Sequence, residues 1–517
     1  MVIMKRRVCI IGLDGVGLHN LNVFRDNLAV SGITTITNNG FSTSPLSIPP
    51  YTPCSWTSIF TGVNPGKHGI YGFFNISRRG DGFSVSLGTS FSVMYPRIFE
   101  MASMFGLKSV VINVPLTYPV KALAGLNNIV VVSDWASPRQ FIYPKYYMEK
   151  YKELLVDPPH TWARATNVKL YVKAVEYFLE KRLDLYYELL DEGSFDLYVI
   201  IFSELDWLFH KIPDVIKGHK LNYIYKVVSL IDKFVRKAVE TCDLVILVSD
   251  HGFNIVNILL GVNRILFNEG FIHLNYKLNP NKFRKFKDYE SIILIENSNK
   301  NALSNAFSTA LLRFFTFVSS LLPTPILAKL ESFAPISTSI DYSRSKAFMI
   351  EASNWGLYVK RGYLDMVKKF ISTRINLIAK VLEKHDIFWG PYINRAPDLI
   401  IVPQDHTFFD TRIHTEPVHM TYISEHDSHA LLALYGDAVE KAGNKPDGDS
   451  NVEPSLFDIV PTILAYLGLP LPHDSDGRPL LELLDIDPQN IVRKYNYLYR
   501  FKLARRATNL STRFGQI

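Results

Sequence analysis

Three apolar runs that each end at an aspartate constrain this 517-residue chain more than any other feature. The runs are VCIIGLD at 8–14, DLYVIIFSELD at 196–206 and LVILVSD at 244–250. Runs that are apolar on both faces are typical of parallel strands inside a sheet. Because parallel strands end at one edge, Asp14, Asp206 and Asp250 would meet where open α/β sheets bind ligands. Three such carboxylates repel one another unless cations hold them.

Two histidines strengthen the case for a metal site. His251 directly follows Asp250, and His210 follows Asp206 by four residues. If the chain turns helical after the strand, Asp206 and His210 share a helix face. Carboxylate and imidazole together are good ligands for zinc or manganese. The alternative is that each aspartate only caps the helix after its strand, which is the simpler interpretation of any one of them alone.

A candidate nucleophile lies in the segment at 47–70. Thr52 followed by Pro53 is typical of a helix N-cap and first helical position, and Gly62 is a typical helix stop. The Thr52 hydroxyl would lie at the positive end of a short helix, which favours an alkoxide and phosphoryl oxygens. Taken alone, the same residues also fit an ordinary helix start.

In order along the chain, the motifs resemble the alkaline phosphatase superfamily, and most of all its type I phosphodiesterase/nucleotide pyrophosphatase branch. The motifs are LDG at 13–15, TPCSWTSIFTGVNPGKHGI at 52–70, DWLFH at 206–210, SDHGF at 249–253, YSRSKAFM at 342–349, GPYINRAPDLIIVP at 390–403 and the segment 453–481. The resemblance covers nearly the whole chain, apart from parts of 270–340 and the tail after about 485.

The resemblance implies a site for two divalent metal ions, with zinc as the first expectation and manganese as the alternative. One metal would be held by Asp14, Thr52, Asp250 and His251. The other would be held by Asp206, His210 and a further histidine about ten residues before a glycine that follows a strand. Counting back from Gly436 selects His426, and His429 is the competitor.

The resemblance also implies a phosphohydrolase in which Thr52 forms a covalent phospho-threonine intermediate that water then hydrolyses. Where related nucleotide pyrophosphatases carry an asparagine, this chain has Phe73, so Asn75 or Lys67 would have to contact the phosphoryl group. From 47 to 75 the chain has no Arg and only Lys67, which favours singly charged diesters over dianionic monoesters. An arginine such as Arg264 or Arg313 could still supply the missing charge.

Two alternatives to a phosphodiesterase stay open. A phosphomutase or phosphomonoesterase of the same superfamily would keep the phospho-Thr52 step. A non-catalytic protein could instead bind nucleic acid or a membrane surface through its tail. Residues 491–517 contain seven Lys or Arg, no acidic residue and interleaved aromatics. The same tail could also pack on the acidic surface of its own body or of a second subunit in a homo-oligomer.

Alternating strand and helix patterns predict an α/β fold, a three-layer α/β/α sandwich with a mainly parallel central sheet. We expect a catalytic core at 1–253 and 346–484, a cap insertion at 254–345 and a basic tail at 485–517. The net charge of +7 suits an anionic substrate without indicating nucleic acid by itself.

The cysteines and the apolar stretches bear on location. Three cysteines without a CxxC motif predict no disulfide framework and a reducing compartment. The first apolar run meets Asp14 too soon for a signal peptide, and the stretch at 314–328 is too short to span a membrane. A cytoplasmic protein without a transmembrane segment is the expectation.

Overall fold

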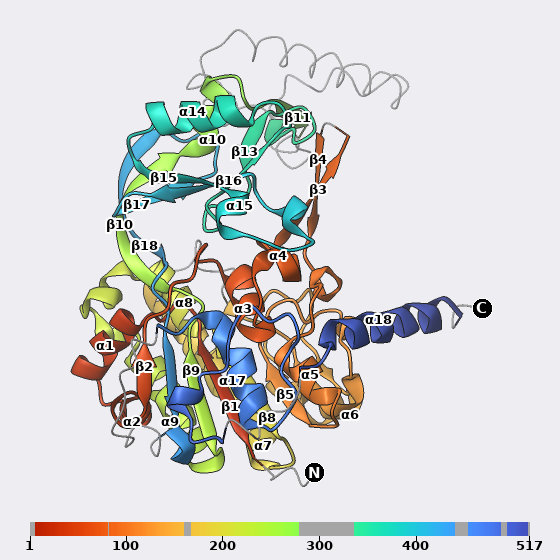
Figure 1. Cartoon of the computed structure of the whole chain (residues 1–517). Helices are drawn as coiled ribbons and strands as arrows, with labels where there is room; N and C mark the ends of the chain where they lie inside the picture. Colours follow the sequence, from red (N-terminus) through yellow and green to blue (C-terminus); the bar gives the residue numbers. More distant parts are fainter. Residues whose placement is uncertain are drawn as a thin grey trace, which may run out of the picture.

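The computed structural model describes residues 6–80, 82–159, 167–278, 336–439, 453–487 and 494–514. Its lower body is built on an eight-stranded sheet (Figure 1) with the strand order β2-β19-β9-β1-β8-β5-β6-β7. The strands are β1 (Val8–Leu13), β2 (Phe41–Thr43), β5 (Ser109–Ile112), β6 (Ile129–Val132), β7 (Ile142–Tyr143), β8 (Leu197–Phe202), β9 (Leu244–Val248) and β19 (Leu432–Tyr435).

The centre of this sheet is parallel, and its edges are not. β1 pairs in parallel with β8 and β9, and β5 pairs in parallel with β8 and β6. β7 and β19 run antiparallel to their neighbours, β6 and β9. The three aspartate-ending runs predicted from the sequence are therefore adjacent strands that end at one edge.

Helices cover both faces of the sheet, and each central strand is therefore buried on both sides. In β1 the side chains of Cys9 and Ile11 face one apolar core, and those of Val8 and Ile10 face the other. The first core includes residues of α1 (Leu18–Asn27), α2 (Ser31–Asn39), α7 (Val168–Asp191), α8 (Glu204–Lys211) and α9 (Tyr225–Thr241). The second includes residues of α3 (Thr52–Thr61), α5 (Ile98–Ser103) and α17 (Ile459–Tyr466). This is the predicted three-layer α/β/α sandwich.

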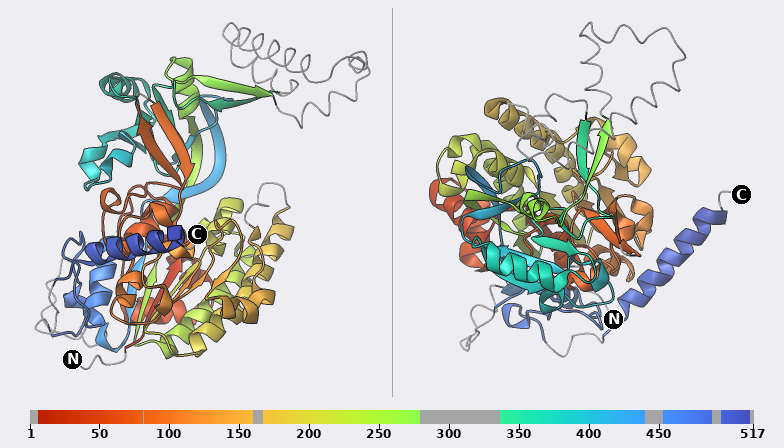
Figure 2. Two further views of the ribbon diagram at one scale, coloured as in Figure 1. Left: turned by 90° about the vertical axis from the view of Figure 1, so that its right-hand side faces the viewer. Right: turned by 90° about the horizontal axis from the view of Figure 1, so that it is seen from above.

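An upper unit stands over the edge where the strands end (Figures 1 and 2). It contains a four-stranded sheet, β13-β14-β16-β15, a three-stranded sheet, β17-β10-β18, and two two-stranded sheets, β11-β12 and β3-β4. Its strands are β3 (Phe74–Arg79), β4 (Gly82–Leu87), β10 (Gly252–Gly261), β11 (Leu274–Leu278), β12 (Ile336–Ile340), β13 (Ala347–Met349), β14 (Gly356–Val359), β15 (Ile378–Glu383), β16 (Leu399–Pro403), β17 (Thr407–Asp410) and β18 (Val418–Asp427). Its helices include α10 (Val262–Asn268), α14 (Leu364–Arg374) and α15 (Lys384–Ile387).

The structure draws the cap boundary differently from the sequence prediction. The segment from β13 to β18, which the sequence places in the core at 346–484, shares sheets and an apolar core with the upper unit. The upper unit thus includes the stretch from β10 to β18, well past the predicted limit of 345, and also the β3–β4 pair, which the prediction places in the core at 1–253. An apolar strand pattern shows that a strand is buried without showing in which sheet it lies, which explains the difference.

The cysteine prediction is wrong in one respect. Cys9 of β1 and Cys242, which follows α9, form a disulfide, and Cys54 is free and buried. The pairing of β1 with β9 brings together two residues that are 233 positions apart, so no local motif could signal it. The cysteines therefore no longer support a reducing compartment.

The basic tail forms α18 (Tyr497–Phe514), which extends away from the body (Figures 1 and 2). Arg505 anchors it by donating to backbone carbonyls of Ser90, Val93 and Ala122. Among the described residues, no helix is both long and apolar enough to span a membrane.

Candidate active site

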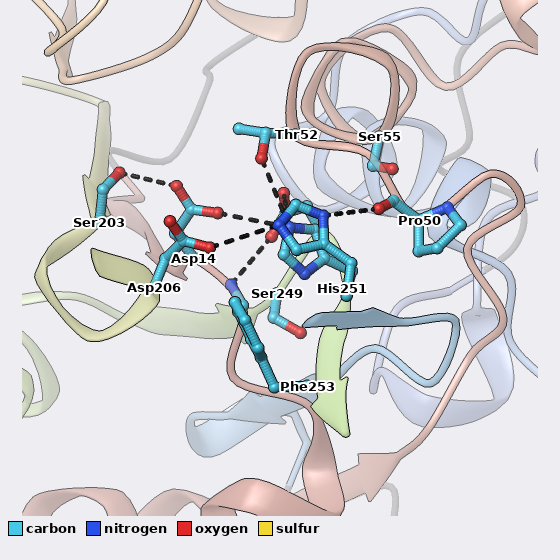
Figure 3. A network of polar contacts seen from close by, with 12 residues as sticks. Asp14, Pro50, Thr52, Ser55, Ser203, Asp206, Ser249, His251 and Phe253 are labelled. Atoms are coloured by element: carbon cyan, nitrogen blue, oxygen red, sulfur yellow. Dashed lines mark hydrogen bonds and ion pairs between the residues drawn. The ribbon is translucent and has the colours of Figure 1, made fainter. Parts of the chain in front are cut away.

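The ends of three neighbouring strands bring the predicted acidic residues together, and Figure 3 shows Asp14 and Asp206 beside His251. Asp14 directly follows β1, and Asp250 follows β9 by two residues. Asp206 and His210 lie on α8, which begins where β8 ends, so the predicted helical turn after that strand is present. One helical turn separates these two residues, and their side chains share a face of α8.

Asp14, Asp250 and His251 form a first, fully buried group. The Nε2 atom of His251 lies 3.8 Å from Oδ1 of Asp14 and 3.3 Å from Oδ2 of Asp250. Ser203 donates to Oδ2 of Asp14 at 2.7 Å, and the backbone N–H of Gly15 donates to Oδ1 of Asp250 at 3.2 Å. One oxygen of each carboxylate is thus fixed and the other is left facing His251.

Asp206, His210 and His426 form a second group beside the first. Oδ1 of Asp206 lies 3.7 Å from Nε2 of each histidine. His426 comes from β18, its Nδ1 lies 2.9 Å from the Pro50 carbonyl oxygen, and its ring stacks on that of His251 at 3.7 Å.

The competitor histidine lies elsewhere. His429 is exposed, and its Nδ1 pairs with Asp427 at 2.7 Å. The structure therefore brings His426, and not His429, to the other predicted ligands.

Burial makes this cluster unfavourable for charge in the absence of cations. The pKa of Asp14 rises to about 8, first through burial and then through the charge of Asp206. Burial raises the pKa of Asp206 to about 7 and holds that of Asp250 well above its usual range. Burial also lowers the pKa of His251 to about 3 and that of His426 well below its usual range.

Unpartnered oxygens show that the cluster fits divalent cations. Oδ1 of Asp14, Oδ1 of Asp206 and Oδ2 of Asp250 are buried, and none accepts a hydrogen bond. A buried carboxylate oxygen without a donor is costly unless a cation meets it. Neutral imidazoles beside such oxygens are the donor set that zinc and manganese take.

Thr52 begins helix α3 beside the first group. The structure makes Tyr51 the N-cap and Thr52 the first helical residue, so the helix begins one position earlier than predicted, and it ends as predicted at Gly62, which has a φ of 68°. Thr52 is buried, and its Oγ1 lies 3.4 Å from Nε2 of His251. The hydroxyl therefore lies at the positive end of the helix and faces the cluster.

A pocket of about 280 Å³ opens beside Thr52 and the second group. Most of its wall is aromatic. Its lining residues are Tyr51, Thr52, Phe73, Trp135, Tyr171, Asp206, Trp207, His210, Ser353 and His426. None of these ten is a lysine or an arginine, so the described part of the chain brings no fixed positive charge to the pocket wall.

The structure does not bring the predicted phosphoryl contacts to this pocket. Lys67 pairs with Asp476 at 2.5 Å and donates to the Asp474 carbonyl, and Asn75 donates to Ser92 at 2.7 Å. Neither residue lines the pocket, so we assign no substrate contact to either. Arg264 also lies outside the lining, and Arg313 is outside the described residues.

The sequence reasoning missed two residues of the site. Ser203 precedes α8 and holds Asp14, and Glu351 of the upper unit accepts from Tyr51. Ser203 could have been noticed as a hydroxyl between β8 and Asp206. Glu351 is 300 residues from Tyr51 in the chain, and no local pattern could have connected the two.

The family model described as type I phosphodiesterase / nucleotide pyrophosphatase matches residues 8–315, which include six of the seven predicted ligands. The chain belongs to this family. The predicted family is therefore confirmed, and membership supports a phosphoric ester hydrolase. No curated protein sequence matches the chain.

Solved structures of the alkaline phosphatase superfamily share the fold, which confirms the predicted fold class. The alkaline phosphatase PafA has a TM-score of 0.55 at 14% identity, covering 94% of this chain and 100% of its own. Murine ectonucleotide pyrophosphatase/phosphodiesterase 5 has a TM-score of 0.52 at 12% identity, and the match covers 93% of this chain and 100% of the murine one. Phosphonoacetate hydrolase from Sinorhizobium meliloti 1021 has a TM-score of 0.52 at 13% identity, and the match covers 89% of this chain and 95% of the hydrolase.

Proposed function

We propose that this chain is a two-metal phosphodiesterase that acts through Thr52. One observation carries the proposal: the Thr52 hydroxyl faces a buried carboxylate–imidazole cluster in which three carboxylate oxygens have no hydrogen-bond partner and suit cations. The family membership supports the same class of reaction. In a related structure, a threonine-to-alanine variant of murine ectonucleotide pyrophosphatase/phosphodiesterase 5 that is described as inactive is bound to AMP.

The two groups of side chains would each hold one ion. Asp14, Asp250 and His251, with Thr52, would hold the first, and Asp206, His210 and His426 would hold the second. Zinc is the first choice because the donors are imidazole nitrogens and carboxylate oxygens, and manganese is the alternative. When bound, the ions lower the pKa of the Thr52 hydroxyl and neutralise charge on the phosphoryl oxygens.

The protein's own groups then determine the course of the reaction. The Thr52 oxygen attacks phosphorus, the bond to the leaving alcohol breaks, and phospho-Thr52 forms. The free N–H groups at the start of α3 favour the negative charge on the phosphoryl oxygens. Water then cleaves the phospho-threonine and regenerates the hydroxyl, so two in-line displacements give overall retention at phosphorus.

The pocket favours a diester substrate. A monoester dianion carries more negative charge than a diester, and enzymes commonly meet such charge with a fixed arginine or another cation. The ten lining residues contain no lysine or arginine, and the aromatic wall can hold an apolar ester substituent. The substrate we propose is therefore a singly charged diester with an apolar or aromatic substituent.

The test is the ratio of kcat/KM for bis(p-nitrophenyl) phosphate to that for p-nitrophenyl phosphate, measured with zinc, manganese and magnesium. We expect a ratio clearly above one with at least one metal. A ratio below one with every metal would overturn the diesterase and leave a phosphomonoesterase or a phosphomutase.

We further propose that the basic tail binds an anionic surface. Arg500, Lys502 and Arg506 are exposed on α18 and form no ion pair within the described part of the chain. Exposed Tyr499 and Leu503 lie one helical turn apart beside these cations. A basic helix that carries aromatic and aliphatic side chains is suited to a layer of anionic headgroups.

A further inference from the structure

Glu351 of the upper unit reaches down to the loop before the nucleophile. It follows β13 by two residues and is 8% exposed. The Tyr51 hydroxyl donates to its Oε1 at 2.7 Å, and the backbone N–H of Phe73 donates to the same oxygen at 2.9 Å. One carboxylate oxygen thus fixes two residues that are far apart from it in the chain.

Both of these partners are walls of the pocket beside Thr52. Tyr51 and Phe73 line the pocket, and their rings meet edge to face at 5.7 Å. Phe73 in turn meets the ring of Trp135 at 5.5 Å, and Tyr51 directly precedes Thr52 at the start of α3. A shift of Glu351 would therefore move the aromatic wall and the entry into the nucleophile helix together.

The Glu351 carboxyl lies so close to Gly72 that the side chain at position 72 determines whether it fits. A Cβ atom at Gly72 would lie 1.9 Å from Oε2 of Glu351, so only glycine leaves room for the carboxylate there. Asn354 of the same segment donates to the Tyr71 carbonyl at 3.4 Å, and Ser353 lines the pocket. The segment after β13 is thus fitted against the loop that carries Phe73.

Among the described residues, no cation pairs with this buried carboxylate. The groups that act on Glu351 are Tyr51 and two backbone N–H donors, and burial raises its pKa to about 7. Burying a carboxylate without a positive partner opposes folding. General stability therefore does not explain the residue, whereas a requirement for a fixed pocket wall does.

We infer that Glu351 is a positioning residue, which holds the Tyr51 and Phe73 wall in the place where it binds the apolar substituent of the diester. The inference rests on the proposed phosphodiesterase function. Glu351 hydrogen-bonds Tyr51 and Phe73 but neither Thr52 nor the carboxylate–imidazole cluster, so it acts through the wall and not on phosphorus. Its loss should weaken the binding of bulky substituents much more than the rate of the chemical step.

The experiment compares two diesters that share one leaving group, bis(p-nitrophenyl) phosphate and methyl p-nitrophenyl phosphate. Glu351→Ala should raise KM for the bis-aryl substrate by about tenfold, the cost of roughly one hydrogen bond to a charged group. Its kcat, its KM for the methyl substrate and its metal content should stay within about threefold, the scatter allowed for distant structural effects. Glu351→Gln keeps an acceptor oxygen and should lie close to the wild type.

The matched control is Asp341→Asn, which alters a carboxylate of the upper unit that is also 8% exposed and is bonded to Ser343. It should leave the ratio of the two KM values unchanged. Equal losses on both substrates in Glu351→Ala, or loss of metal, would make Glu351 merely structural. No loss on either substrate would overturn the inference outright.

A binding measurement separates this inference from the proposed function. If the wild type hydrolyses neither diester, the phosphodiesterase proposal fails, but phenylphosphonate and methylphosphonate can still be titrated against the metal-loaded protein. Trp135 and Trp207 line the pocket, so their fluorescence reports on binding. Glu351→Ala should weaken phenylphosphonate about tenfold more than methylphosphonate, since only the former reaches the wall. Equal effects on the two ligands would overturn the positioning role.

Discussion

The carboxylates of Asp14, Asp206 and Asp250 are buried in the lower body, and burial raises the pKa of each. Within the described residues, their ion-pair partners are all histidines. Burial lowers the pKa values of two of these histidines, His251 and His426, and so favours their neutral form. Replacing such a group by apolar residues is often neutral or stabilising, so folding alone gives no reason to retain it. Strongly shifted pKa values around a pocket are typical of functional sites.

At the same scale, Thr52 allows the nucleophile to be separated from the metal ligands. Thr52→Ala should reduce turnover by about 10³-fold or more, as removal of a nucleophile does. Its metal content should stay near that of the wild type, because Asp14, Asp250 and His251 remain. Thr52→Ser should keep measurable activity. Turnover and bound metal per chain are the two measurements, and loss of both metals in Thr52→Ala would give Thr52 a structural role.

A second substitution at residue scale tests which histidine completes the second group. The metal-loaded protein should hold two ions per chain, and His426→Ala should lose one of them. His429→Ala is the matched control, because His429 is exposed and pairs with Asp427. Elemental analysis after exhaustive dialysis gives the count. The assignment is wrong if the two variants behave in the opposite way.

At the scale of elements, the sequence predicts best what local rules determine. The strands β1, β8 and β9 are buried over their whole length, as their apolar runs predict. Pro53 and Gly62 indicate where α3 begins and ends. Local patterns fail where a distant segment decides. Lys67 is a predicted phosphoryl contact, but its ammonium group pairs with Asp476, which lies 409 residues away in the chain. His426 could be selected only through the family resemblance, since β18 reaches Asp206 from another sheet.

Helix α18 gives a prediction at this scale. Changing Arg500, Lys502 and Arg506 together to Gln should weaken binding to phosphatidylglycerol-containing vesicles by about 3 kcal/mol, at roughly 1 kcal/mol per cation near an anionic surface. Co-sedimentation measures binding, with pure phosphatidylcholine vesicles as the neutral reference. Changing the exposed Lys169, Lys173 and Lys181 of α7 to Gln is the matched control. Equal binding to both kinds of vesicle would reject the anionic surface, and tighter binding to single-stranded DNA would favour nucleic acid.

At the scale of the whole molecule, the proposed site lies between the two units and is built from both. Asp206 and His210 come from α8 of the lower body, whereas His426 comes from β18 of the upper unit. The chain also crosses between the units here, because β10 begins directly after His251. A metal at the second group would therefore tie the units together as well as serve the reaction, and the carboxyl of Glu351 adds a second tie on the far side of Tyr51.

Removal of the metals should consequently loosen the upper unit before the lower one. Bound ions stabilise the folded state by about 2.7 kcal/mol when their concentration is about 100 times Kd, so a chelator should lower Tm measurably. Because His426 is the only predicted ligand on β18, hydrogen exchange after chelation should rise most in β10, β17 and β18, and least in β1, β8 and β9. His426→Ala already lacks the proposed metal ligand on β18, so the chelator should cause little further increase in hydrogen exchange in β18 of this variant. A uniform rise over both units, or an undiminished chelator effect in His426→Ala, would show that the second metal does not link them.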